Sequence, residues 1–331
     1  MTVNSGDNFF PYVSIVIAAY NCENSLPLTL DSIKKLKYPN KKIEIIIIDD
    51  ASVDNTANIA KSYNIKVISH NKRLGVAGAR NTGIQNSINE FIAFIDADCI
   101  VSENWLKNLI KPFRDTSVWA TGGYILNYKN EKTNIHKFIN FDLMYRKRNN
   151  ITKSVPGGNS AFRKITFNKL GLLDEKFEGA EDIEISIRIL KSGHKLVFVD
   201  SAIVYHPFPS SIPNYFLKNM NYAKNRTQLY LNKNYFNFKD DHTPNIIIVQ
   251  PFILFLIIFN LILYNYNIIL YTQYIAIFLF FILILLNINF LILVYKHNFN
   301  LLLFTFLMII IKNFSLLIGI ILGSIHYIKK R

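Results

Sequence analysis

Cysteine is scarce in this chain of 331 residues, which contains only Cys22 and Cys99. Two distant cysteines form neither a disulfide framework nor the paired spacing of a zinc site, and they fit a reducing compartment. Acidic residues are also outnumbered, 23 against 37 lysines and arginines, which gives a formal net charge of +14. No basic stripe interleaved with aromatic residues marks a nucleic-acid-binding module, so we expect no nucleic-acid partner.

Charged residues become rare after Pro244, where Ile, Leu, Phe, Tyr and Asn dominate. Ile246–Tyr264 and Ile268–Leu286 contain no charge, and each approaches the ~20 residues that cross a bilayer as a helix. A third apolar stretch, Leu301–Leu322, has Lys312 at its middle, and a central lysine is costly in lipid. We therefore predict two spans followed by a re-entrant or interfacial third element, with a third span as the alternative.

Basic residues orient this membrane region. Lys296 follows the second apolar stretch and Lys329–Arg331 ends the chain, and the positive-inside rule places such residues in the cytoplasm. We expect a multi-pass protein of the cell membrane whose preceding domain is cytoplasmic. The basic and aromatic stretch Tyr215–Tyr235 is expected to lie on the membrane surface, against lipid headgroups. The polar N-terminus lacks the apolar segment of a secretion signal.

These changes of composition divide the chain. The predicted parts are a flexible N-terminus (1–11), a globular domain (12–210, with halves 12–100 and 101–210), an interfacial amphipathic segment (211–243) and a membrane region (244–331).

Short apolar strands alternate with helices in the first half of the globular domain. Strands are predicted at 13–18, 43–48, 65–69 and 91–95, and helices at 25–36, 54–62 and 76–88. Strands that are apolar throughout predict a parallel sheet covered on both faces, with ligands bound beyond the carboxyl ends of the strands. Glycine is missing from the first turn, residues 18–22. This absence excludes the glycine-rich fingerprint of dinucleotide-binding domains.

Two acids separated by one residue, Asp96 and Asp98, follow the apolar run Phe91–Ile95. Alternation along a strand puts them on the same side, where their repulsion calls for a counter-charge. A hard divalent cation with oxygen ligands, Mg²⁺ or Mn²⁺, is the usual one. The alternative is a plain strand-to-turn transition with solvated aspartates.

Taken together, six segments resemble family 2 glycosyltransferases. They are Val13–Asn21, Asp49–Thr56, Asn71–Gly83, Asp96–Asp98, Gly157–Arg163 and Glu181–Asp182, and the resemblance covers about Val13 to His206. It implies an α/β fold of the GT-A type: a Rossmann-like, mostly parallel sheet with helices on both faces, here followed by C-terminal transmembrane helices. Departures are Ala18, where proline is common, and Glu184, where aspartate is more common.

The resemblance also implies roles for individual residues. The nucleotide-sugar would be bound by Ala19, Tyr20, Asn21, Asp49, Asp50, Arg80 and Asp96, and sugars by Gly158 and Asn159; Asp98, Asp96 and His206 would hold the metal, and Asp182, with Glu181 beside it, would be the catalytic base. A tyrosine face suits a nucleobase, and a guanidinium suits a diphosphate. Each residue also has a structural interpretation, as a packing tyrosine, a turn-forming acid, a helix-surface arginine or a buried histidine.

The implied function is a membrane-bound, metal-dependent, inverting hexosyltransferase. It would move a sugar from a nucleotide-sugar to a hydroxyl of a lipid-linked or cell-surface glycan, using Mn²⁺ or Mg²⁺ and working among membrane lipids. One alternative is a polyprenyl-phosphate glycosyl synthase, whose phosphate acceptor needs no base such as Glu181 or Asp182. The other is a non-catalytic, membrane-anchored protein that binds a nucleotide or sugar, against which the intact set of acids argues.

Overall fold

The computed structural model describes residues 9–128, 133–146, 150–177, 179–235, 245–266, 269 and 271–329. Their contacts divide the chain into two units, residues 9–128 with 150–207, and residues 133–146 with those from 208 onward. Residues 133–146, placed in the globular domain from sequence, thus group with the C-terminal helices. Most of the predicted flexible N-terminus (1–8), residues 236–243 of the interfacial segment and the terminal residues 330–331 lie outside the described residues.

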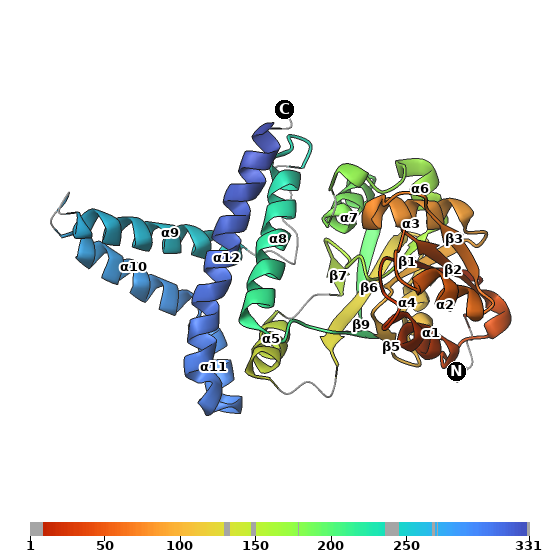
Figure 1. The fold of residues 1–331 in the computed structure, drawn as a ribbon, viewed down its shortest axis with the longest axis horizontal. Helices are drawn as coiled ribbons and strands as arrows, with labels where there is room; N and C mark the ends of the chain where they lie inside the picture. Colours follow the sequence, from red (N-terminus) through yellow and green to blue (C-terminus); the bar gives the residue numbers. More distant parts are fainter. Residues whose placement is uncertain are drawn as a thin grey trace, which may run out of the picture. The chain divides into compact units, whose positions relative to one another are not determined.

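A nine-stranded mixed sheet forms the centre of the first unit (Figure 1). Its strands are β1 (Val13–Ala19), β2 (Ile43–Asp49), β3 (Lys66–Ser69), β4 (Phe91–Asp96), β5 (Ile100–Val101), β6 (Val118–Asn127), β7 (Ile151–Thr152), β8 (Asn159–Arg163) and β9 (Lys195–His206). The order is β3-β2-β1-β4-β8-β6-β9-β5, and β7 pairs with β9. Strands β1 to β4 are mutually parallel as predicted, whereas β8 runs antiparallel to both β4 and β6.

Helices cover both faces of this sheet, which confirms the predicted layering. They are α1 (Leu26–Lys34), α2 (Thr56–Ser62), α3 (Gly75–Asn86), α4 (Trp105–Ile110), α6 (Lys164–Leu170) and α7 (Glu181–Lys191), with short 3-10 turns at Asn40–Lys42, Lys111–Arg114 and Glu175–Phe177. Alternate residues of β4 face opposite layers: Phe91, Ala93 and Ile95 pack with α1 and α4, and Ile92 and Phe94 pack with α3, α6 and α7. Period-two alternation of apolar residues therefore builds two cores around one sheet.

The register of the parallel strands brings three polar strand ends together. Ala19 at the end of β1 lies beside Asp49 of β2, and Ala18 lies beside Asp96 of β4. The carboxyl edge of these strands is therefore lined by acids from β2 and β4, the strands on either side of β1, and ligands bind at this edge in open α/β sheets.

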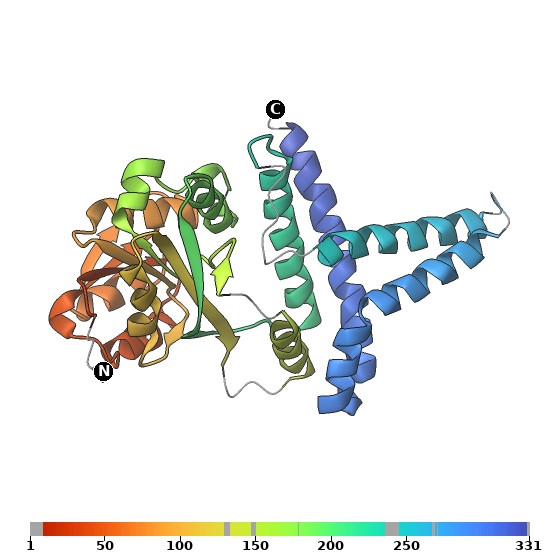
Figure 2. The same ribbon diagram turned by 180° about the vertical axis from the view of Figure 1, so that it is seen from behind.

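The second unit consists of helices. They are α5 (Asn134–Tyr145), α8 (Ile212–Leu231), α9 (Asn245–Asn265), α10 (Thr272–Leu286), α11 (Ile288–His297) and α12 (Leu302–Lys329), with a 3-10 turn at Phe299–Leu301. Figures 1 and 2 show α8 alongside α12, and α9 beside α10 in a hairpin that projects from α12.

Two glycines one helical turn apart allow α8 and α12 to approach closely. A Cβ atom added at Gly319 would lie 2.3 Å from the carbonyl oxygen of Met220, and one at Gly323 would lie 2.6 Å from that of Lys224. This small-xxx-small spacing is typical of tightly packed helices in membranes.

The helix α12 differs from the sequence prediction, which interrupted this stretch at Lys312. It runs without a break from Leu302 to Lys329. The Nζ atom of Lys312 lies 2.9 Å from Oδ1 of Asp142 on α5, and this ion pair offsets the cost of a lysine among apolar residues.

Length and composition select one candidate membrane span among the described residues, the helix Phe299–Lys329. Helices α10 and α11 qualify only as one span bent by 57°, and Val249–Asn265 of α9 counts as a shorter apolar helix. This criterion thus selects a different helix from the two uncharged stretches that the sequence ranked first.

Candidate active site

A buried arginine joins acids from two distant segments. Arg80 on α3 donates from Nη2 to Oδ1 of Asp96 at 2.8 Å and from Nη1 to Oε1 of Glu181 at 2.7 Å. The guanidinium is only 4% exposed, so it is held between the two carboxylates instead of reaching outward for a diphosphate. The three residues form one ion-paired triad at the carboxyl edge of β4.

Two glycines allow the loop before β8 to lie against this triad. A Cβ atom added at Gly158 would lie 2.0 Å from Oδ2 of Asp96, and one at Gly157 would lie 2.6 Å from Nη1 of Arg80. Any side chain at either position would displace the triad or the loop. The predicted Gly158 is therefore placed beside the acids, where only backbone fits.

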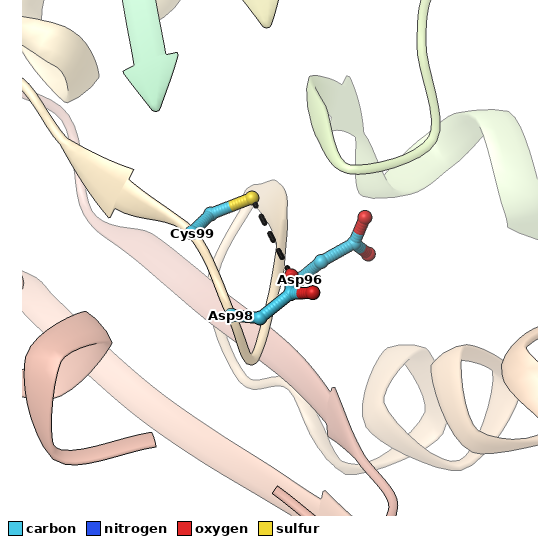
Figure 3. A group of neighbouring side chains, drawn as sticks. All are labelled: Asp96, Asp98 and Cys99. Atoms are coloured by element: carbon cyan, nitrogen blue, oxygen red, sulfur yellow. Dashed lines mark hydrogen bonds between the residues drawn. The ribbon is translucent and has the colours of Figure 1, made fainter. Parts of the chain in front are cut away.

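Asp98 and Cys99 lie next to Asp96, on the turn after β4 (Figure 3), and His206 ends β9. One ligand atom each from Asp96, Asp98 and Cys99 fall within 4.8 Å of one another, and Nε2 of His206 lies 3.3 Å from Oδ2 of Asp98. Burial raises the pKa of the Cys99 thiol far above its usual range, and this thiol donates to Oδ1 of Asp98. The donors left are carboxylate oxygens and an imidazole nitrogen, which fit a hard divalent cation.

The acid pair of α7 divides into a buried and a partly exposed member. Glu181 is 4% exposed, whereas Asp182 is half-buried. Asp182 accepts from the backbone N–H of Gly157 at Oδ2 (3.1 Å) and from that of Ile183 at Oδ1 (2.8 Å). These two bonds fix the Asp182 carboxylate beside the glycine loop.

Burial raises the pKa of Glu181 to about 7, against the opposing effect of the Arg80 guanidinium and with a further contribution from Asp182. Within the described part of the chain, its Oε2 atom is buried without a hydrogen-bond partner. Glu181 is therefore a buried acid that is ion-paired with Arg80, and Asp182 is the member of the pair that a substrate can approach.

The acids that follow β2 have different partners. Both oxygens of Asp50 accept backbone N–H groups at the start of α3, from Leu74 and Gly75 (2.8 Å each), and Oδ1 also lies 2.8 Å from Nδ1 of His70. Asp49 accepts one bond, from Ser52 N at 3.1 Å. Asp50 thus caps the start of α3, whereas the Asp49 carboxylate accepts fewer hydrogen bonds from the protein.

Tyr20 and Asn21, which follow β1, lie at the same edge. The Tyr20 ring is 41% exposed, and the guanidinium of Arg73 lies 4.2 Å from its centroid. Asn21 accepts from Val53 N and its own N–H donates to Ser52 Oγ, so it holds the loop after β2. Tyr20 is therefore available to a flat ligand, whereas the Asn21 side chain is engaged in the fold.

Asn159 lies in the interior of the sheet, fully buried. Its Nδ2 atom donates to the carbonyl oxygens of Tyr124 and Ala202 at 2.9 Å each, and its Oδ1 accepts from Trp105 Nε1 at 2.7 Å. These partners join β6, β8, β9 and α4. Such a set of bonds is that of a structural residue.

Residues 14–171 match the family model described as "Glycosyl transferase family 2". They form a family 2 glycosyltransferase domain. The chain is 28% identical to the glycosyltransferase AglE of Haloferax volcanii over 207 residues, which cover 60% of this chain and 67% of AglE. It is 29% identical to the probable glycosyltransferase YdaM of Bacillus subtilis over 218 residues, 61% of this chain and 52% of YdaM. The match thus spans only about half the length of YdaM.

Solved structures show the fold of this glycosyltransferase domain. The mannosyltransferase PcManGT from Pyrobaculum calidifontis, in complex with GDP-Man and Mn²⁺, gives a TM-score of 0.61 at 17% identity, over 98% of this chain and 89% of that one. GalNAc-T7 with UDP, GalNAc and Mn²⁺ gives 0.51 at 24% identity, over 67% and 51%. The predicted GT-A fold is confirmed.

Two site features of the glycosyltransferase domain escaped the sequence analysis. Arg73 lies within a motif that was recognised, but nothing in its spacing indicates that it covers Tyr20. Tyr128 donates from its hydroxyl to the carbonyl oxygen of Asp98 at 2.9 Å, and it follows β6 with no motif of its own. Both contacts join segments that are distant in the sequence.

Proposed function

We propose that this chain transfers a sugar from a nucleotide-sugar to a hydroxyl of a lipid-linked or cell-surface glycan, with inversion at the anomeric carbon. The observation that carries the proposal is the shared guanidinium of Arg80. It joins Asp96, which is followed by Asp98, to Glu181, which is followed by Asp182, within a family 2 glycosyltransferase domain. The carboxylates proposed to bind the metal and the carboxylate proposed to take the acceptor's proton would then lie in one site.

For the nucleotide-sugar donor, we assign Asp98 and Asp96, with His206, to the binding of a divalent metal. PcManGT and GalNAc-T7 are both complexes with Mn²⁺, and the oxygen-rich donor set here fits Mn²⁺ or Mg²⁺. When bound, such an ion stabilises the negative charge of a leaving nucleoside diphosphate. Arg80 acts as a positioning residue, because it orients the Asp96 carboxylate.

The nucleobase is assigned to the ends of β1 and β2. The exposed face of Tyr20 offers a stacking surface, and Asp49 offers an acceptor for a base N–H. Asp50 is excluded from this role, because both of its oxygens already accept bonds from the start of α3.

The base is assigned to Asp182. Its partly exposed carboxylate is fixed by two backbone N–H groups and takes the proton of the acceptor hydroxyl as that oxygen attacks the anomeric carbon. The attack comes from the face opposite the leaving diphosphate, so a single displacement inverts the configuration. Glu181 is buried and paired with Arg80, which leaves it a supporting role.

The membrane arrangement proposed here keeps the uncharged hairpin of α9 and α10 as two crossings, although length and composition select Phe299–Lys329, and it places α8 and α12 along the cytoplasmic surface. The polar helix α8, with Lys218 and Lys224, lies alongside α12 (Figures 1 and 2), and a helix of that composition does not cross lipid. The hairpin carries no charge, and exposed tyrosines gather at its tip, as in an aromatic belt: Tyr264, Tyr266, Tyr271 and Tyr274.

An enzyme held in this way gains most on an acceptor confined to the same surface, through effective concentration. We therefore assign an amphiphilic acceptor, a polyprenyl-linked saccharide, to the cytoplasmic face of the cell membrane.

Two experiments test these assignments. Purified full-length protein would be incubated with a panel of uridine and guanosine diphosphate sugars, with Mn²⁺, Mg²⁺ or chelator, and with lipid extract as acceptor. We expect metal-dependent transfer to a lipid-linked saccharide; no transfer from any donor would contradict the proposal. Transfer to polyprenyl phosphate itself, retained by Asp182→Asn, would instead indicate the synthase reaction.

Topology is tested by single cysteines introduced in a background with Cys22 and Cys99 replaced by serine. We expect Tyr271→Cys to be labelled from outside the cell and Arg331→Cys only after the cells are opened. External labelling of residue 331 would contradict the two-crossing arrangement.

A further inference from the structure

A charged cavity lies within the helical unit, among residues that the proposed transfer does not use. It measures about 60 Å³ and is lined by side chains that include Asp142 and Arg146 of the α5 segment, Gln250 of α9, Asn287 after α10, and Lys312 and Asn313 of α12. These polar and charged side chains share the lining with apolar and aromatic ones: Phe138, Tyr145, Leu286, Phe290 and Ile309. Polar groups in such surroundings are costly unless they have a partner or a function.

Two cations in this cavity share one carboxylate. Oδ1 of Asp142 lies 2.9 Å from Lys312 Nζ, and Oδ2 lies 2.7 Å from Arg146 Nη2. Among the described residues, the side-chain hydrogen bonds and ion pairs of both cations go to Asp142 alone. A lysine has three N–H donors and an arginine five, so the cluster keeps one net positive charge and several donors for an anion.

The amides beside the cations fix the helices and leave the charge unchanged. Asn313 Nδ2 donates to Gln250 Oε1 at 3.2 Å, Gln250 Nε2 donates to Asn287 Oδ1 at 3.3 Å, and Asn287 Nδ2 donates to the carbonyl oxygen of Leu283 at 2.8 Å. This chain of bonds ties α12 to α9 and α10. It supports the cavity walls while the two cations face the open space.

The cavity lies at the base of the α9–α10 hairpin, at the end opposite to its tyrosine-rich tip. Gln250 is in the second turn of α9, and Asn287 directly follows α10. The 15 residues of α10 span about 22 Å, so the base lies well away from the tip along the bilayer normal. In the proposed membrane arrangement this base lies on the cytoplasmic side of the hairpin, away from its tip.

We propose that Arg146 and Lys312 bind the phosphate of an amphiphilic lipid, whose apolar chain lies against the exposed apolar side of the α9–α10 hairpin. A phosphate group presents a few terminal oxygens, which match a space for a few water molecules, and charge-assisted bonds to arginine and lysine are the usual way to hold it. The ligand of this site is the phosphate that links lipid and saccharide in the acceptor, and this identification rests on the proposed function.

The binding test uses the full-length protein in phosphatidylcholine nanodiscs without nucleotide-sugar. Farnesyl phosphate, farnesol and inorganic phosphate are the three probes, and native mass spectrometry or phosphorus NMR gives the affinities. We expect farnesyl phosphate to bind more tightly than either of the other two. Equal binding of farnesol would overturn the phosphate site, and equal binding of inorganic phosphate would overturn its assignment to a lipid.

Variants separate this site from unspecific attraction to a basic protein. Lys312→Met and Arg146→Met should each weaken farnesyl phosphate binding about tenfold or more, because one charge-assisted bond is lost. Lys312→Arg should keep the affinity, and Lys296→Met, an exposed lysine of α11, should leave it unchanged. Wild-type affinity in folded Lys312→Met would overturn the proposal.

Asp142→Asn should raise the affinity for farnesyl phosphate, an effect that misfolding would not produce. It removes the competing carboxylate, so farnesyl phosphate should bind more tightly; weaker binding with an unchanged melting temperature would count against the site. The binding test does not measure sugar transfer, so its result can be compared with that of the separate transfer experiment. A protein that binds the lipid phosphate but transfers nothing contradicts only the proposed function, and one that transfers sugar with no phosphate preference contradicts only this inference.

Discussion

Arg80 Nη2 lies 2.8 Å from Asp96 Oδ1, so a cation carried by a helix is tied to the last residue of β4. The pair is shielded from water on the arginine side, where only 5% of the side chain is exposed, and more open at Asp96, where 34% is. Since an ion pair of this kind has one well-defined geometry, Asp96 has a fixed orientation before any ligand arrives.

Arg80→Lys should lower the transfer rate about tenfold or more. A lysine keeps the charge but lacks the planar fork that reaches Asp96 and Glu181 together. The Mn²⁺ concentration for half-maximal activity should rise as well, because the Asp96 carboxylate is no longer oriented. A variant with a lower melting temperature but an unchanged Mn²⁺ midpoint would show that Arg80 is structural only.

Asp98→Asn should lower turnover ~10²-fold or more, since a metal at this position supplies several kcal/mol of charge stabilisation. Folded yield and melting temperature should change little, because the Asp98 side chain is partly open to solvent. The matched control is Asp200→Asn, an exposed aspartate of β9, which should keep full activity. Full activity of wild-type protein in excess chelator would contradict the metal assignment.

Asp182→Asn should retain nucleotide-sugar binding and lose transfer by ~10²–10⁴-fold, the usual contribution of a general base. The amide still accepts the bond from Gly157 N through its oxygen, so the loop should keep its position. Donor binding by calorimetry and single-turnover transfer separate the two effects. If Asp182→Asn transfers sugar at the wild-type rate, Glu181 becomes the next candidate for the base.

Glu181 should make the stability of the protein depend on pH below neutrality. Its pKa is raised from 4.5 to about 7 on folding, so the folded state holds the proton more tightly than the unfolded state. Its contribution is fully present below pH 4.5 and is lost as the pH rises through 7.

Melting temperatures of wild type and Glu181→Gln between pH 4.5 and 7.5 check this prediction. The wild type should lose stability relative to the variant as the pH rises across this range. Glu90→Gln, at an exposed acid, serves as the control and should follow the wild type. Parallel curves for wild type and Glu181→Gln would exclude the raised pKa.

Gly319→Leu or Gly323→Leu should separate α8 from α12. The backbone of α8 lies so close that even a Cβ atom would clash, and overpacking of this kind typically costs 1–3 kcal/mol or more. Thermal unfolding of the full-length protein in detergent should shift to lower temperature. Ile321→Leu, at an exposed position of the same helix, should not shift it.

The sequence was sufficient for the parallel half of the sheet and for the edge where its acids gather. Short apolar runs such as Ile45–Ile48 between helical segments indicate buried strands, and a parallel sheet fixes where their ends meet. The antiparallel strand β8 was not predicted, because Asn159–Arg163 is short and its pairing with β4 depends on segments about 70 residues apart.

Partners distant in the sequence explain what else was missed. Glu181 is 101 residues from Arg80, so spacing could not show that the arginine would be buried between two acids. Lys312 is 170 residues from Asp142, and without that partner a lysine in an apolar stretch reads as an interruption. Local patterns determine periodicity, whereas the cost of a buried charge is decided by whatever folds against it.

The capped start of α3 has a consequence for the dimensions of the site. Asp50 fixes Gly75 to the end of β2, and Arg80 follows five residues later on the same helix, a rise of about 7.5 Å. The helix is thus a rigid spacer between the strand end assigned to the nucleobase and the guanidinium that holds Glu181. The distance from Gly75 to Arg80 is therefore set by helical rise.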